Sequence, residues 1–189
     1  MVHQAKNTVS HCSLSLLPLV FLITVFYSCK EKTSTVEQMK VYEGPIMEVD
    51  SLQTLFSDNA ILRVKFNAGK ELDYQSGDKE FLKGVRVEFF NEKGVQEAVL
   101  TSHKGFQEKN TGIYRVEEDV VVQNFKDKKE LHTEKLFWDS SKKRIYTPET
   151  ELVRIKTPRE VLTGKGLEAA QDFSWYKIKN PSGVTYLTE

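Results

Sequence analysis

The side chains most able to do chemistry are few, and none falls into a known catalytic spacing. Beyond the N-terminal stretch there are two histidines, His103 and His132, and neither belongs to a His-Glu-x-x-His or comparable metal-binding pattern. No Gly-x-Ser-x-Gly elbow exists. Gly-Lys pairs occur at 69–70 and 164–165, without the preceding glycine and following Ser/Thr of a phosphate-binding loop. We therefore predict no catalytic residue, no metal site and no cofactor, and a chain that is not an enzyme.

Two cysteines complete the inventory of reactive groups. Cys12 and Cys29 both lie in or beside an apolar N-terminal stretch, so the rest of the chain has no thiol for a disulfide, a metal or a nucleophile. The apolar run covers residues 14–27, which is shorter than the roughly 20 residues of a membrane-spanning helix. This length is typical of the hydrophobic region of a signal peptide.

The apolar run ends at Ser28-Cys29 and is followed by a polar segment. An apolar core, a small residue and then cysteine resemble the processing site of a bacterial lipoprotein, which implies acylation of Cys29. The preceding Phe26-Tyr27 departs from the commonest pattern, and an uncleaved signal anchor is the alternative. Either reading places residues 30–189 outside the cytoplasm. We predict a signal peptide at 1–28, a tether at 29–41 and a folded domain at 42–189.

The charge distribution argues against nucleic acid as a partner. The chain has 27 basic and 27 acidic residues, and the two signs are interspersed rather than clustered.

The folded part is predicted to be all-β. Apolar residues alternate with polar ones in Leu62-Arg63-Val64-Lys65-Phe66 and again in Val85-Arg86-Val87-Glu88-Phe89. Residues 46–57 are predicted as a short helical turn or an irregular strand. Turn signals separate the strands, and the predicted turns are 67–69, 76–78, 91–94, 110–112 and 180–183.

A weak internal repeat accompanies this alternation. Leu100, Leu131 and Leu162 are 31 residues apart, and each is followed by a threonine and later by an Ile-Tyr or Trp-Tyr pair. Each unit has the length of two strands with two turns. Stacked units of this kind predict a slab or half-open roll with one continuous apolar interior.

Three strings of residues carry a family resemblance. The strings are 130–139, which includes Leu-x-Thr-x-x-Leu-x-Trp-Asp, then 143–147, and 162–167 with Gly-x-Gly-Leu. Together with Gly44-Pro45 and residues 83–90 they resemble LptC, the periplasmic component of the lipopolysaccharide export system, over residues 42–188. The resemblance implies an open β-jellyroll of antiparallel strands that belongs to the superfamily of OstA-like and LptA-like rolls.

The resemblance also implies partners and a location. Family members accept lipopolysaccharide from an inner-membrane ABC transporter (LptB/LptF/LptG-like) and pass it to a periplasmic bridge protein (LptA-like), while ATP is hydrolysed elsewhere. Many members hold the inner membrane by a transmembrane helix, whereas this chain is expected to use the lipid on Cys29. The rival function is an envelope-tethered structural or binding lipoprotein without lipid transfer.

Two sets of residues are predicted to serve this function. Side chains expected inside the roll, where they would contact acyl tails or pack as core, are Phe66, Val87, Phe89, Leu100, Val122, Leu131, Phe137, Ile145 and Leu162. The last strand, expected at Trp175–Lys179, is predicted to dock a second roll by its free edge. Residues expected at that partner-binding edge are Gly164, Gly166, Trp175, Tyr176 and Ile178. For the two glycines a turn or bulge is the alternative explanation.

Overall fold

The computed structural model describes residues 42–182, and that part of the chain is built from strands without a helix. The predicted signal peptide, Cys29 and the predicted tether at 29–41 lie outside the described residues. The eleven strands of the described part are β1 Met47–Asp58, β2 Ile61–Asp73, β3 Lys79–Phe90, β4 Gln96–Ser102, β5 Lys104–Gln107, β6 Ile113–Asn124, β7 Lys129–Asp139, β8 Arg144–Tyr146, β9 Leu152–Lys156, β10 Val161–Ala170 and β11 Tyr176–Ser182.

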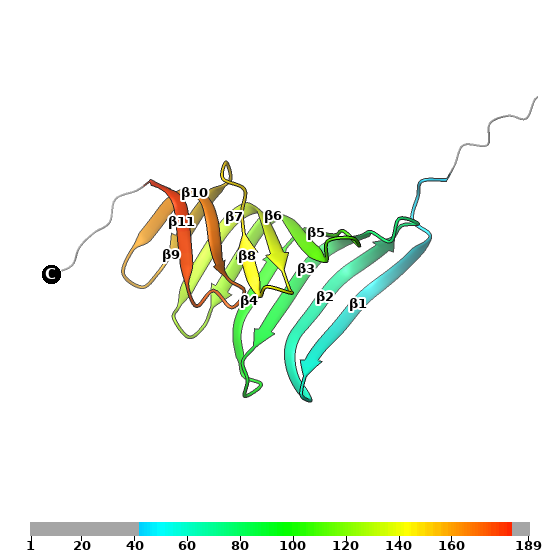
Figure 1. Ribbon diagram of the computed structural model, residues 1–189, viewed down its shortest axis with the longest axis horizontal. Helices are drawn as coiled ribbons and strands as arrows, with labels where there is room; N and C mark the ends of the chain where they lie inside the picture. Colours follow the sequence, from blue (N-terminus) through cyan, green and yellow to red (C-terminus); the bar gives the residue numbers. More distant parts are fainter. Residues whose placement is uncertain (1–41, 183–189) are drawn as a thin grey trace, which may run out of the picture. The chain divides into compact units, whose positions relative to one another are not determined.

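All strands belong to one antiparallel sheet (Figure 1). The order is β1-β2-β3-β4-β6-β7-β8-β10-β11, with β5 beside β3 and β6, and β9 beside β7 and β10. Strands that follow each other in the chain are therefore mostly neighbours. Within the described residues β1 and β11 each pair with one strand only, so the sheet has two free edges.

A crease crosses the sheet near the middle of its long strands. Left-handed backbone occurs at Ser51 in β1 (φ 61°), at Lys83 and Gly84 in β3 (φ 59° and 89°), and at Glu118 and Asp119 in β6 (φ 67° and 52°). At Lys83-Gly84 and at Glu118-Asp119 the pairing with the neighbouring strand has a register irregularity, and such bulges bend strands and increase their twist.

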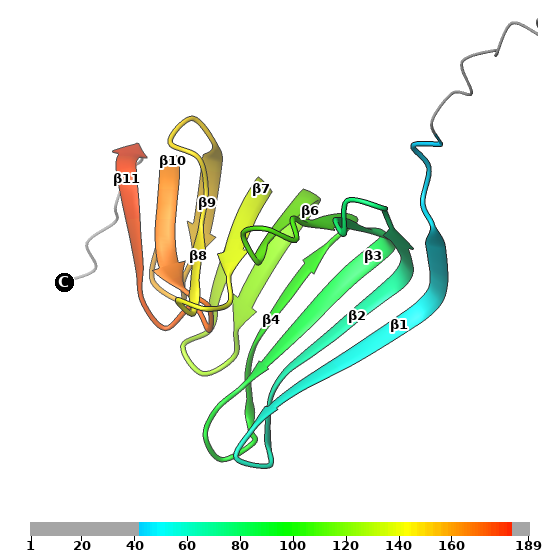
Figure 2. The same ribbon diagram turned by 45° about the vertical axis from the view of Figure 1, so that its right-hand side comes forward.

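Hydrogen bonds show that these irregularities form one line. The Gly84 N–H donates to the His103 carbonyl (3.0 Å), and the His103 N–H donates to the Glu118 carbonyl (3.0 Å). His103 is the residue between β4 and β5, and a similar interruption separates β8 from β9. The sheet folds along this line, so the halves of the long strands on its two sides form the two arms of an open roll. Figure 2 shows the curved sheet running from β1 at one end to β11 at the other. The predicted all-β open jellyroll is confirmed.

The crease explains why one predicted turn is wrong. Residues 67–69 lie inside β2, and the strand continues through them with a register irregularity opposite β3. A Cβ on Gly69 would lie 2.5 Å from the carbonyl oxygen of Lys83. Glycine is needed there for close approach of two strands, not for a chain reversal. Residues 180–182 are likewise in β11 rather than in a turn, and Pro181 is tolerated because β11 is an edge strand.

Two rows of paired side chains fill the roll. One row crosses the strands through Thr54, Phe66, Val87, Leu100, Val122, Leu131, Ile155 and Leu162. The three leucines of the 31-residue repeat all belong to it, which confirms that the repeat marks equivalent positions in the roll. The other row contains Tyr114, Trp138, Ile145, Ala169 and Tyr176.

Candidate functional site

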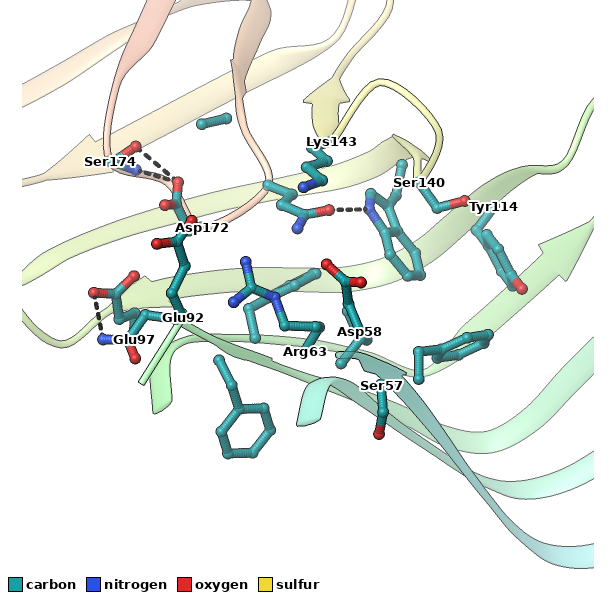
Figure 3. Close-up of a pocket in the computed structure, with 18 residues that line it drawn as sticks. Ser57, Asp58, Arg63, Glu92, Glu97, Tyr114, Ser140, Lys143, Asp172 and Ser174 are labelled. Atoms are coloured by element: carbon teal, nitrogen blue, oxygen red, sulfur yellow. Dashed lines mark hydrogen bonds between the residues drawn. The ribbon is translucent and has the colours of Figure 1, made fainter. Parts of the chain in front are cut away.

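A cavity of about 590 Å³ opens between the ends of the two arms (Figure 3). On one side it is bounded by the β1–β2 and β3–β4 hairpins, and on the other by the β7–β8 and β10–β11 turns. The apolar residues Val64, Phe89, Tyr114 and Trp138 line it from within. We call this opening the mouth of the roll.

Aromatic packing fixes the floor of the mouth. The Phe89 ring meets Trp138 edge-on at 5.6 Å, and Tyr114 lies 4.9 Å from Trp138 between ring centroids. Trp138 Nε1–H donates to Gln171 Oε1 at 3.1 Å, so its polar atom is satisfied and the rest of the indole offers apolar surface. Burial raises the pKa of Tyr114, which keeps its hydroxyl neutral.

Two β-bulges direct charged side chains to the rim. Phe56 pairs with Val64 and Ser57 with Leu62, which leaves Arg63 as the extra residue of β2. Neighbouring residues of a regular strand face opposite sides of the sheet, but a bulge changes the direction of a side chain. Arg63 and its neighbour Val64 therefore both border the cavity.

The second bulge repeats this pattern in the β3–β4 hairpin. Phe89 pairs with Ala98 and Phe90 with Gln96, so Glu97 is the extra residue of β4 and lies at the rim. Its carboxylate accepts a hydrogen bond from Asn91 Nδ2 at 3.0 Å.

The opposite rim is held by the β7–β8 turn. Asp139 Oδ1 accepts hydrogen bonds from Ser141 Oγ (2.6 Å) and from the Lys142 N–H (3.0 Å). These bonds, together with the Lys142 ammonium at 2.9 Å, lower the pKa of Asp139 to about 2. The turn ends in Lys143, whose backbone is left-handed (φ 53°) and whose side chain points into the mouth in Figure 3.

Most of the predicted interior residues are deeply buried. Phe66, Val87, Leu100, Val122, Leu131 and Ile145 belong to the core and are at most 4% exposed, and Leu162 packs against this core while partly buried. Only Phe89 of the predicted set also borders the cavity. Whether these side chains contact lipid stays a prediction.

Phe137 is placed differently from expectation. It is half-buried on the outer face, where its ring stacks on Tyr146 at 5.3 Å, while Leu136 and Trp138 on either side are buried. Strict alternation from Leu131 predicts Phe137 inside. The crease opposite Glu118 and Asp119 shifts the alternation of β7 by one residue, so this prediction is wrong.

The residues predicted for the partner-binding edge lie in or beside β10 and β11. A Cβ on Gly164 would lie 2.4 Å from Ile178 Cγ2 and 2.7 Å from the Asn180 carbonyl, so Gly164 admits the chain's own β11. Gly166 is a left-handed residue of the crease (φ 72°). Tyr176 stacks on Phe173 (5.4 Å) and Ile178 packs on the core, while Trp175 is 45% exposed under the Arg144 guanidinium.

The mouth itself is not predicted by the sequence. Val64, Tyr114 and Trp138 were visible as members of strands, but nothing marked them as cavity walls. Residues 42–182 contain no helix long and apolar enough to cross a membrane. The same residues show no group of three or more His, Cys, Asp or Glu side chains arranged to hold a metal ion.

Comparison with known proteins decides the family. The family model described as "Lipopolysaccharide-assembly, LptC-related" matches residues 17–180, which is most of the chain. The chain belongs to the LptC family. No curated protein matches the sequence. LptC proteins are periplasmic, inner-membrane-associated components of lipopolysaccharide transport and not a known enzyme family, so this chain has a role in that transport.

Proposed function

We propose that this LptC-family chain accepts lipopolysaccharide from an inner-membrane transporter of the LptB/LptF/LptG type and passes it to an LptA-like bridge protein. The observation that carries the proposal is the mouth, an apolar cavity bordered by charged residues and open between two arms of a roll. A carrier in water must cover acyl tails and leave sugars outside, and this arrangement separates those two environments.

The energetic demand explains the apolar floor. Exposing a tail of about 12 methylenes to water costs on the order of 10 kcal/mol, at roughly 0.8 kcal/mol per methylene. The cavity of about 590 Å³ has room for roughly 20 groups the size of a water molecule, at about 30 Å³ each. One tail fits this space, and several tails require the two arms to separate, because the rows beneath are packed.

Photo-crosslinking in cells tests this function. A crosslinker at Val64 or Phe89, which border the mouth, should give lipopolysaccharide adducts. The same crosslinker at Lys65 or Glu88 should give none, because these two paired residues alternate with the inward-facing ones and lie on the other face of the sheet. Depletion of the protein should also make lipopolysaccharide accumulate at the inner membrane.

The packed interior rows favour one alternative, an envelope-tethered structural or binding lipoprotein without lipid transfer. That function predicts no adducts at any of the four positions in cells that make lipopolysaccharide normally. The crosslinking pattern therefore separates the two functions.

The handover step is proposed to use β11, which has a free edge. An exposed edge can receive a strand of a second roll through main-chain hydrogen bonds. Tyr176→Asp and Gly164→Val should both weaken capture of the bridge protein in a pull-down, the second because it displaces β11. Val95→Asp, on the exposed β3–β4 turn, is the control. Unchanged capture by both β11 variants would remove this step.

Anchoring is proposed to occur through acylated Cys29, with residues 29–41 as the tether and 42–189 as the periplasmic domain. The processing-site pattern of the sequence supports this, and a retained signal anchor is the alternative. Two or more acyl chains hold a protein stably to a membrane, whereas one does so only marginally. Mass spectrometry of the purified protein distinguishes the two: an intact segment 1–28 excludes the lipoprotein. Membrane fractionation should find the protein with the inner membrane.

A further inference from the structure

We propose that Arg63 and Lys143 form a two-cation clamp at the mouth, which binds a phosphate group on the sugar headgroup of an acylated lipid. The inference rests on the proposed function and adds the part of the lipid that the mouth recognises. The tails enter the apolar cavity, and the phosphate stays at the rim between the two arms.

The backbone supplies the first argument. Arg63 is the extra residue of the β1–β2 bulge, and Lys143 has a left-handed backbone that costs a lysine stability. Both departures from regular geometry border the same cavity, although they come from opposite arms. Figure 3 shows the two side chains directed into the space between those arms. Irregular backbone that aims side chains at a cavity is typical of binding sites.

The pairing of charges supplies the second argument. Along residues 42–182 many cations have a carboxylate within 4.0 Å, among them Lys79, Lys104 and Lys142, which lies next to Lys143. Arg63 and Lys143 take part in none of the ion pairs of this part of the chain. A guanidinium binds phosphate through two parallel hydrogen bonds, and an ammonium adds a point charge. Other cations of this part of the chain also lack such a partner, but Arg63 and Lys143 are the two that border the cavity, so both can bind a ligand there.

The carboxylates of the rim determine whether a free phosphate ion or the phosphate group of a lipid is bound. Four of them border the cavity, namely Asp58, Glu92, Glu97 and Asp172. Glu97 accepts a hydrogen bond from Asn91, and Asp172 accepts two from Ser174. The rim as a whole is net negative, so it does not attract a free phosphate ion strongly. A phosphate is held there when the tails of the same molecule are buried in the cavity.

Lipid binding by the purified full-length protein tests the clamp. The two probes are a bis-phosphorylated, acylated glucosamine disaccharide and the same lipid after phosphatase treatment. Arg63→Gln and Lys143→Asn should each weaken binding of the phosphorylated lipid about tenfold, which corresponds to the loss of one charged hydrogen bond. Neither should change binding of the dephosphorylated lipid. Asparagine is chosen at 143 because it tolerates left-handed backbone.

Lys65→Gln is the matched control, since it removes the same charge from β2 at a residue that does not border the cavity. Equal loss of both lipids, no loss of either, or a loss in Lys65→Gln as large as in Arg63→Gln would overturn the clamp. Unchanged unfolding temperatures show that the variants remain folded, and Arg63→Lys should recover part of the affinity.

The same experiment separates this inference from the proposed function. If the unaltered protein binds both lipids equally well, the clamp is wrong and the carrier function stands. If it binds neither lipid, the carrier function and the clamp fail together. Displacement of the bound lipid by millimolar inorganic phosphate would overturn the assignment to a lipid headgroup, because the net negative rim predicts no such competition.

Discussion

Replacing Phe89 by alanine should test whether the mouth accepts acyl tails. Phe89 is 2% exposed, packs on Trp138 and borders the cavity. Loss of a buried phenylalanine costs about 3–5 kcal/mol. Leu131→Ala is the matched control, because Leu131 is fully buried, does not border the cavity and should cost about 2–5 kcal/mol. Without lipid, the two variants should therefore lose comparable stability.

With lipid the two variants should differ. The space left by the Phe89 ring is continuous with the mouth, so a tail can extend into it. About three additional methylenes buried there at roughly 0.8 kcal/mol each stabilise the complex by about 2 kcal/mol. The void at Leu131 lies within the packed row, where no tail reaches without disrupting the core.

Thermal unfolding with and without saturating lipopolysaccharide measures the difference. For a domain of this size about 2 kcal/mol corresponds to roughly 8 °C in unfolding temperature. The lipid-induced increase should accordingly be larger by about that amount in Phe89→Ala than in Leu131→Ala. Equal increases in both variants would refute the idea that tails enter at the mouth, and an absent increase in the unaltered protein would refute lipid binding itself.

Two further perturbations test the crease and the interior charge. Gly69→Ala should lower the free energy of unfolding by about 1–3 kcal/mol in a urea titration, because the new Cβ would overlap the Lys83 carbonyl; an unchanged urea midpoint would contradict the close approach. Glu71 is buried, and its burial, opposed by the hydrogen bond from Lys79, raises the pKa of its carboxyl above the ordinary value of 4.5. Between the ordinary pKa and the raised pKa, the folded protein binds more protons at Glu71 than the unfolded chain does. The contribution of Glu71 to stability therefore decreases as the pH rises from the ordinary value to the raised pKa. Compared with the unaltered protein at the same pH, Glu71→Gln should therefore have a more favourable free energy of unfolding at pH 7 than at pH 4. If urea titrations give a difference between the two proteins that does not depend on pH, the pKa of Glu71 is not raised.

The sequence predicted the strands and the repeat well because both depend on alternation. The row through Leu100, Leu131 and Leu162 follows from a period of two within strands and from equal spacing between them. Glycine, by contrast, was misread at Gly69, where a turn signal marks a place at which two strands approach closely inside the sheet. Local composition does not distinguish these two uses of glycine, because the neighbouring strand is needed to tell them apart.

The mouth was not predictable for a related reason. A bulge exists only relative to its partner strand, and no residue type marks Arg63 or Glu97 as the unpaired one. The crease also passes through Lys83 and Glu118, which are not residues that favour left-handed backbone. The misplacement of Phe137 follows from this, since an unseen bulge in β6 reverses the facing of every later side chain in β7.

Regular alternation and its interruptions have different roles in this roll. The alternation produces an apolar interior that is packed along most of its length. Carriers and structural proteins both have packed interiors, so this feature alone does not distinguish the two functions. The interruptions at Arg63, Glu97 and Lys143 come from separate hairpins and turns, yet all three border one opening. Independent irregularities that cost stability rarely meet at one place unless that place has a function. Since the opening lies between the arms, and the free edges β1 and β11 lie at the ends of the sheet, a lipid held at the mouth leaves both edges available for neighbouring rolls. Transfer along such a row would keep tails inside and charged headgroups at the rim throughout.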